Sequence, residues 1–124
     1  MKRILIPTDY SNYADFAITS GAKLARKIGA EVTLLHVMEG ENENKDKVDE
    51  QIEMVRSSNI FGDTPYKLQI VEGNPIRKIV DQEADYIVMG SHIENGMKGF
   101  FNPTNSERVA KQANCPVITL KHYL

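Results

Sequence analysis

The chain has very little cysteine and no long hydrophobic run. Its single cysteine, Cys115, excludes an internal disulfide and cannot supply a cysteine-rich zinc site. The longest apolar segment, 32–37, is interrupted by two polar residues and falls far short of the ~20 residues that span a bilayer. Only a short apolar stretch lies between Arg3 and Asp9, which does not resemble a secretory signal. We therefore expect a cytoplasmic protein with no metal site.

Neither sign of charge predominates, because 15 Lys and Arg residues stand against 17 Asp and Glu residues. The net charge is -2, which favours neither nucleic acid nor an anionic membrane as the main partner. With 124 residues, 41% of them hydrophobic, the chain is long enough for one core and too short for two. We expect a single domain over residues 1–124.

Apolar segments with the pattern of buried strands alternate with segments of helical spacing. Alternation of this kind predicts an α/β fold with an open parallel sheet and helices on both faces. The expected strands are 4–6, 32–37, 66–72, 86–89 and 117–120, and the expected helices are 11–28, 48–55, 75–80 and 104–113. The third strand nearly alternates apolar and polar residues, so we expect it nearer a sheet edge.

Two strand ends carry residues that suit a ligand. Pro7, Thr8 and Asp9 follow the first strand, and Gly90-Ser91-His92 follows the fourth. In open sheets, ligands bind beyond the carboxyl ends of strands where the strand order reverses. If these two strands are neighbours, the two segments face each other across a crevice.

A helix is expected to begin close to this crevice. Residues 104–107 match a capping box, in which the Thr104 hydroxyl caps the helix and Glu107 reaches back. The free N–H groups at a helix start attract phosphate. Thr104 is interpreted first as a cap, although one hydroxyl can serve both uses in different states.

Five motifs in this order resemble the universal stress protein family. They are the segments 4–11, 34–37, 88–91, 106–109 and 115–117. The resemblance covers essentially the whole chain and is weakest between Glu39 and Tyr66, where the chain is short. It implies a Rossmann-like sheet of strand order 3-2-1-4-5 and homodimers that pair their fifth strands, Val117 to Leu120.

The resemblance also implies a site for an adenine nucleotide, ATP or AMP. Asp9 would lie against the adenine or its flanking backbone, and the phosphates would lie over the loop that starts at Gly90. The residues that it implies for binding are Pro7, Thr8, Asp9, Val37, Met89, Gly90, Ser91, His92, Thr104 and Asn105.

The loop departs from the family's glycine pattern. That pattern is glycine, two residues, glycine, nine residues, glycine, then serine or threonine. Gly90 and Thr104 are kept, but Ile93 and Pro103 replace the other two glycines. Glycine lets the backbone approach phosphate closely, whereas proline has no N–H to donate. We therefore expect nucleotide binding to be weak or absent.

Several residues have a plain structural interpretation beside the functional one. Asp9 could cap the first helix, and His92 could be a solvated loop residue. His36, inside a strand, is interpreted as a hydrogen-bonded wall of the crevice rather than a catalytic group. Cys115 is interpreted as a small buried thiol rather than a nucleophile. Phe100 and Phe101 are expected to pack the long loop down, although they could equally form an exposed patch for a partner.

The sequence favours a dimeric regulatory protein of the stress response over an enzyme. It has no P-loop lysine motif, no suggestive nucleophile–base pair and no cluster of metal ligands. Three alternatives stay open: a family member that binds no nucleotide and acts through an unknown protein partner, a structural dimerisation module, and a slow ATP-hydrolysing enzyme. In the last case Lys98 or Arg108 would reach the phosphates.

Overall fold

The computed structural model describes residues 1–8, 14–38, 45–93 and 101–123. Strands and helices alternate along them. In chain order they are β1 (Arg3–Pro7), α1 (Ala14–Ile28), β2 (Glu31–Met38), α2 (Lys45–Ser58), β3 (Tyr66–Glu72), α3 (Pro75–Val80), β4 (Tyr86–Ile93), α4 (Pro103–Gln112) and β5 (Val117–Tyr123).

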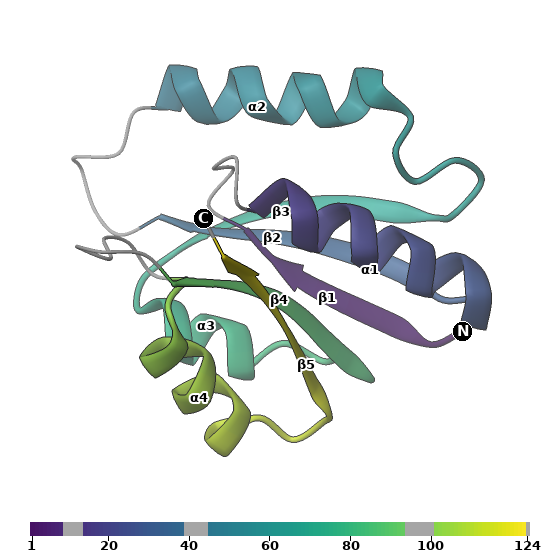
Figure 1. The fold of residues 1–124 in the computed structure, drawn as a ribbon. Coiled ribbons are helices and arrows are strands. Elements are labelled where there is room, and N and C mark those ends of the chain that lie inside the picture. The colour runs from purple at the N-terminus through teal and green to yellow at the C-terminus, as the bar shows by residue number, and fades with distance from the viewer. Residues whose placement is uncertain (9–13, 39–44, 94–100, 124) are drawn as a thin grey trace.

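The strands form one parallel sheet in the order β3-β2-β1-β4-β5. This confirms the expected fold class and the strand order. Helices α1 and α2 lie above the sheet in Figure 1, on what we call the upper face, and α3 and α4 lie below it, on the lower face. The strand order reverses between β1 and β4, which are direct neighbours. The two segments that were expected to face each other across a crevice therefore follow adjacent strands.

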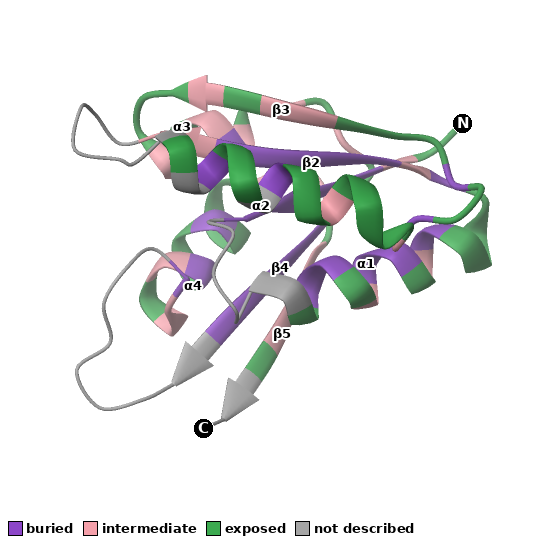
Figure 2. Cartoon of the chain, turned by 90° about the horizontal axis from the view of Figure 1, so that it is seen from above, coloured by how far each residue is buried: buried purple, intermediate pink, exposed green. Residues whose placement is uncertain are grey.

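Alternation along the central strands divides the core into two layers. Ile4 and Ile6 of β1 belong to the upper core, and Leu5 between them belongs to the lower core. Side chains on a strand point to opposite faces in turn, so a strand buried on both faces is apolar throughout. Figure 2 shows this as purple along most of β2, and in β1 every residue after Arg3 is buried.

The two edge strands are less buried. In Figure 2, β3 is mostly green and pink, and the described part of β5 is also exposed or half-buried. This confirms the expectation that the third strand lies at an edge. Tyr66 and Ile70 of β3 are 40% and 43% exposed. Their strand forms one open edge of the sheet.

Strands β4 and β5 are both longer than expected. We expected β4 to end at Met89 and β5 at Leu120, but they run to Ile93 and Tyr123. The added residues pair with one another in register, from Gly90 with Leu120 to Ile93 with Tyr123. The added residues of each strand provide hydrogen-bond partners for the backbone of the other. The sequence of either segment alone does not indicate this pairing. The segment Gly90-Ser91-His92 is therefore part of a strand and not of the loop that follows.

Candidate functional site

The carboxyl ends of β1 and β2 are joined through Thr8 and His36. The Thr8 N–H donates to the Leu35 carbonyl at 2.9 Å, which continues the strand pairing one residue past Pro7. The Thr8 carbonyl lies 2.9 Å from His36 Nδ1. Because a carbonyl only accepts, Nδ1 carries the proton. Both side chains are buried, so His36 is a hydrogen-bonded wall of this edge, as expected.

The residues predicted to shape a base pocket lie on three adjacent strands. Pro7, Thr8 and Met89 are buried, and Val37 is half-buried. Val37 and Met89 contribute to the lower core, where they pack with Leu35. Of these four side chains, Val37 keeps the largest share open to a ligand. Asp9 lies outside the described residues.

Ser91 is the most unusual polar group at this edge. Its side chain is 2% exposed, and its Oγ has no hydrogen-bond partner among the residues that the structure describes. Ser91 follows Met89 by two positions in β4, so both point to the lower face, which α4 covers. Burying a hydroxyl without a partner costs free energy, and native proteins keep few such groups. His92 follows in the strand, and its side chain lies outside the described part of the chain.

The start of α4 differs from the predicted capping box. Asn102 is the N-cap, its side chain accepts the Asn105 N–H at 2.9 Å, and Pro103 is the first helical residue. Asparagine is among the best caps and proline is favoured in the first turn, so this pair sets the start. Thr104 is exposed in the first turn and does not cap. The prediction that the Thr104 hydroxyl caps this helix is wrong.

The same geometry determines which N–H groups α4 can offer to an anion. Pro103 has none, the Asn105 N–H is taken by the Asn102 side chain, and the Ser106 N–H donates to the Asn102 carbonyl at 3.0 Å. The Thr104 N–H has no partner among the described residues. Phosphate at this helix start would therefore meet one free N–H and the positive end of the helix dipole.

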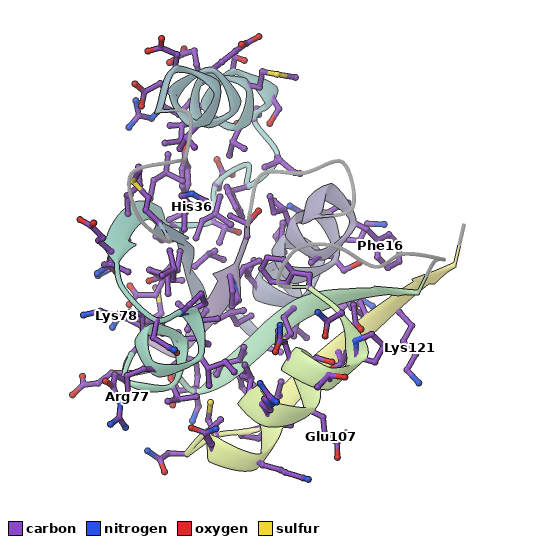
Figure 3. The ribbon with its side chains drawn as sticks, turned by 90° about the vertical axis from the view of Figure 1, so that its left-hand side faces the viewer. Phe16, His36, Arg77, Lys78, Glu107 and Lys121 are labelled. Atoms are coloured by element: carbon purple, nitrogen blue, oxygen red, sulfur yellow. The ribbon has the colours of Figure 1, made fainter. Side chains whose placement is uncertain are left out.

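Lys121 was missed by sequence reasoning. It pairs in register with Ser91, so it lies beside Ser91 on the open edge of β5, and it is exposed. The residue could not be placed from the sequence, because β5 was expected to end before it. Figure 3 looks onto this end of the molecule, with Lys121 on β5 and Arg77 extending outward from α3.

Cys115 and Phe101 have the structural roles expected of them, with one correction. Phe101 is buried in the lower core. Cys115 is half-buried against the same core rather than fully buried. Burial, and next the negative charge of Asp85, raise the pKa of its thiol. A raised pKa keeps the thiol protonated at neutral pH, whereas a reactive cysteine needs a lowered one.

The described ranges contain neither a candidate metal site nor a candidate membrane-spanning helix. No group of three or more His, Cys, Asp or Glu residues in 1–8, 14–38, 45–93 and 101–123 could hold a metal ion. Within the same ranges, no helix is both long and apolar enough to cross a bilayer.

Comparison with known proteins places this fold among relatives of one kind. The model of the universal stress protein family matches residues 1–121. The universal stress protein MJ0577 of Methanocaldococcus jannaschii is 30% identical over 153 residues of alignment, which cover 97% of this chain and 94% of that protein. Its solved structure is 33% identical with a TM-score of 0.72, and the match covers 98% of this chain and 96% of that one.

Two more distant structures were solved with a nucleotide. The universal stress protein from Archaeoglobus fulgidus in complex with dAMP is 22% identical, with a TM-score of 0.70 over 96% of this chain and 97% of that one. A universal stress protein in complex with cAMP is 17% identical, with a TM-score of 0.69 over 96% of each chain. At these identities the likeness shows a shared fold.

Proposed function

The chain belongs to the universal stress protein family, and on that premise we propose that it is a dimeric regulatory protein of the stress response that binds an adenine nucleotide weakly. The nucleotide would lie at the carboxyl ends of β1 and β4. Two solved relatives of this fold hold dAMP and cAMP. The cytoplasmic location expected from the sequence stays a prediction.

The observation that carries the proposal is the unpartnered hydroxyl of Ser91. It lies where the strand order reverses, on the face that α4 covers, and it could donate a hydrogen bond to a ligand oxygen. Lys121 beside it supplies a positive charge that suits a phosphate. The wall formed by Thr8 and His36 stands on the other side of β1, fixed by the 2.9 Å hydrogen bond between them.

The start of α4 supports weak rather than tight binding. Each hydrogen bond to a charged group contributes about 1.5–3 kcal/mol. Pro103 removes one such donor, and the Asn102 side chain occupies another, the Asn105 N–H. We therefore expect dissociation constants between about 10 µM and 1 mM, well above those of a tight nucleotide site.

We further propose binding without turnover. The charged group that the structure brings beside Ser91 is a lysine, and the buried His36 has its Nδ1 proton engaged by the Thr8 carbonyl. The His36 side chain is only 2% exposed, so a water molecule has little access to its other ring nitrogen, and an ammonium group donates hydrogen bonds rather than accepting a proton. Arg108, one of the two cations considered for slow hydrolysis, is exposed on α4, and Lys98 lies outside the described residues.

The test is a calorimetric titration of the full chain with AMP and ATP. A denatured sample is first examined for nucleotide carried through purification. We expect Ser91→Ala to weaken binding about tenfold, because it removes one hydrogen bond to the ligand. Ser57→Ala is the matched control, since the Ser57 hydroxyl is exposed and donates to the Met54 carbonyl at 3.2 Å on α2.

Three results would contradict the proposal. Absence of both carried-over nucleotide and binding up to about 10 mM ligand would assign the function to protein contacts instead. Equal affinities of Ser91→Ala and the parent chain would remove Ser91 from the site. Steady release of phosphate from ATP by the purified chain would show turnover.

A further inference from the structure

A second group of polar side chains lies at the opposite end of the sheet, on the lower face. Arg3 of β1 pairs in register with Glu31 of β2, and Thr33 of β2 pairs with Lys67 of β3. Glu31 and Thr33 are two residues apart, so both point to the lower face. In Figure 1 α3 and α4 lie toward the other end of that face, away from the amino terminus. These four side chains therefore form one polar patch, which we call the amino-end patch.

A cavity of about 270 Å³ opens over the amino-end patch. Arg3, Glu31, Thr33 and Lys67 all line it, together with Pro65. A larger hollow of about 610 Å³ adjoins it, shares Arg3 and Glu31, and has the acidic residues Asp81, Glu83 and Asp85 in its wall. The smaller cavity is just below the usual size range of ligand pockets, so its occupant must be a small molecule.

The hydroxyl of Thr33 is the feature that points to a ligand. The side chain is 2% exposed and its Oγ1 has no hydrogen-bond partner in the described part of the chain, yet the residue lines the cavity. Valine has nearly the same shape and would remove the cost of the unmade hydrogen bond. A ligand with a polar group in the cavity could form the hydrogen bond that the Thr33 hydroxyl lacks.

The charges around Thr33 determine what that partner must carry. The Arg3 guanidinium lies 3.1 Å from Glu31 Oε1 and donates to the Glu83 carbonyl at 3.3 Å, so its charge is largely compensated. No described residue is paired with the second oxygen of Glu31, which can accept from another donor. Lys67 is exposed and has no ion-pair partner within the described part of the chain. The patch thus presents one ammonium, one hydroxyl and one carboxylate oxygen.

We propose that the amino-end patch binds the zwitterion of a small α-amino acid. Its carboxylate would accept from the Thr33 hydroxyl and the Lys67 ammonium, and its ammonium would donate to Glu31. Neighbouring strands are about 4.8 Å apart and alternate residues of a strand about 6.6 Å, so the three groups can all reach one such molecule. Because Arg3 and Glu31 compensate each other, Lys67 leaves the patch with a net positive charge that attracts a carboxylate and disfavours a simple cation. An ammonium on the same ligand adds a contact with the second Glu31 oxygen, which a simple anion cannot make. The site is separate from the nucleotide crevice and does not depend on it.

The experiment is an NMR titration of the ¹⁵N-labelled full chain with alanine. N-acetylalanine, which keeps only the negative charge, and alaninamide, which keeps only the positive one, are the matched ligands. We expect saturable shifts at the amides of residues 31–33 and 66–67, with alanine at least about fivefold tighter than either analogue, as the loss of one good contact predicts. No saturable shift up to about 10 mM alanine would overturn the proposal. So would equal binding of alanine and either analogue.

Variants separate this site from a structural role of the same residues. Thr33→Val should weaken alanine binding about fivefold while it raises the melting temperature, because the unmade hydrogen bond is gone. Lys67→Met should also weaken binding, and Lys23→Met, an exposed lysine of α1 on the other face, should not. If Thr33→Val or Lys67→Met binds alanine as the parent chain does, the proposal is wrong.

Discussion

At the residue scale, two buried hydroxyls stand out on the lower face of the sheet. Thr33 on β2 and Ser91 on β4 are each 2% exposed, and neither side-chain oxygen has a hydrogen-bond partner within residues 1–8, 14–38, 45–93 and 101–123. An unmade buried hydrogen bond costs about 1–3 kcal/mol, which is a sizeable part of the stability of a small domain. The two residues lie toward opposite ends of the sheet, and each lies at a place where we propose a ligand.

Pro103 is the residue that we expect to limit nucleotide affinity. In Pro103→Ala the first residue of α4 regains an N–H, which at this position has no intrahelical partner and can donate to phosphate. We expect AMP and ATP to bind about tenfold more tightly, as one hydrogen bond to a charged group predicts. Calorimetric titration measures the change.

The matched control is Pro75→Ala. Pro75 is the first residue of α3 and follows an asparagine cap, as Pro103 does in α4. The two substitutions change helix propensity in the same way, but α4 packs against β4, the strand that carries Ser91, whereas α3 packs against β2. Unchanged nucleotide affinity in Pro103→Ala would show that the helix start is not the limiting contact.

At the element scale, Gly21 sets how closely α1 approaches the sheet. A Cβ at this position would collide with the side chain of Ile6, which is fully buried in β1, and would lie 3.8 Å from Val88 Cγ1 of β4. We expect Gly21→Ala to lower the free energy of unfolding by about 1–3 kcal/mol, as overpacked cores do. Alanine is the better helix former, so the sign of the effect distinguishes packing from propensity.

Chemical denaturation followed by circular dichroism tests this prediction. Ser20→Ala, the neighbouring position on α1, serves as the control for helix propensity, and it should change stability by less than about 1 kcal/mol. A Gly21→Ala chain more stable than its parent would show that α1 can move away from β1 without loss.

The start of α3 was predicted correctly from the sequence, whereas the start of α4 was not. Asn74-Pro75 and Asn102-Pro103 have the same sequence pattern, and each asparagine caps its helix. In the second case residues 104–107 also match a capping box, and the two signals compete within three positions. The proline decides between them, because its fixed φ suits the first turn and its missing N–H needs no partner there.

At the scale of the whole molecule, the open edge of β5 carries the prediction of a dimer. The Ile87 N–H donates to the Pro116 carbonyl at 3.0 Å, so in a parallel ladder the Ile118 N–H points back to β4. The N–H groups of Val117 and Thr119 then point out of the sheet. An edge of this length invites pairing with another strand.

We therefore expect Thr119→Pro to give monomers. Proline removes one outward N–H and leaves the pairing with β4 intact, which an edge strand tolerates. Light scattering should show the parent chain as a dimer and the variant near 14.0 kDa, with Thr119→Val dimeric as the control. A monomeric parent chain, or a dimeric Thr119→Pro, would place any interface elsewhere.

The chain is also shorter than a relative of the same fold. The alignment with MJ0577 runs over 153 residues, whereas this chain has 124, so at least 29 aligned positions have no residue here. The sheet order and both helical layers are nevertheless complete in the described residues. The strands and helices of this chain therefore form the fold without residues at those positions.

The amino-acid pattern alone predicted the fold class and most of the residues at the carboxyl edge, and the family resemblance predicted the strand order. Local signals sufficed for these, because burial on both faces makes a strand apolar throughout and a cap with proline marks a helix start. Only the tertiary structure decided the length of β4 and β5, the place of Lys121 and the unpartnered state of Thr33 and Ser91. Each of these depends on what a distant strand or helix brings alongside. A strand end or a missing hydrogen-bond partner is a property of the neighbours, and the residue itself does not encode it.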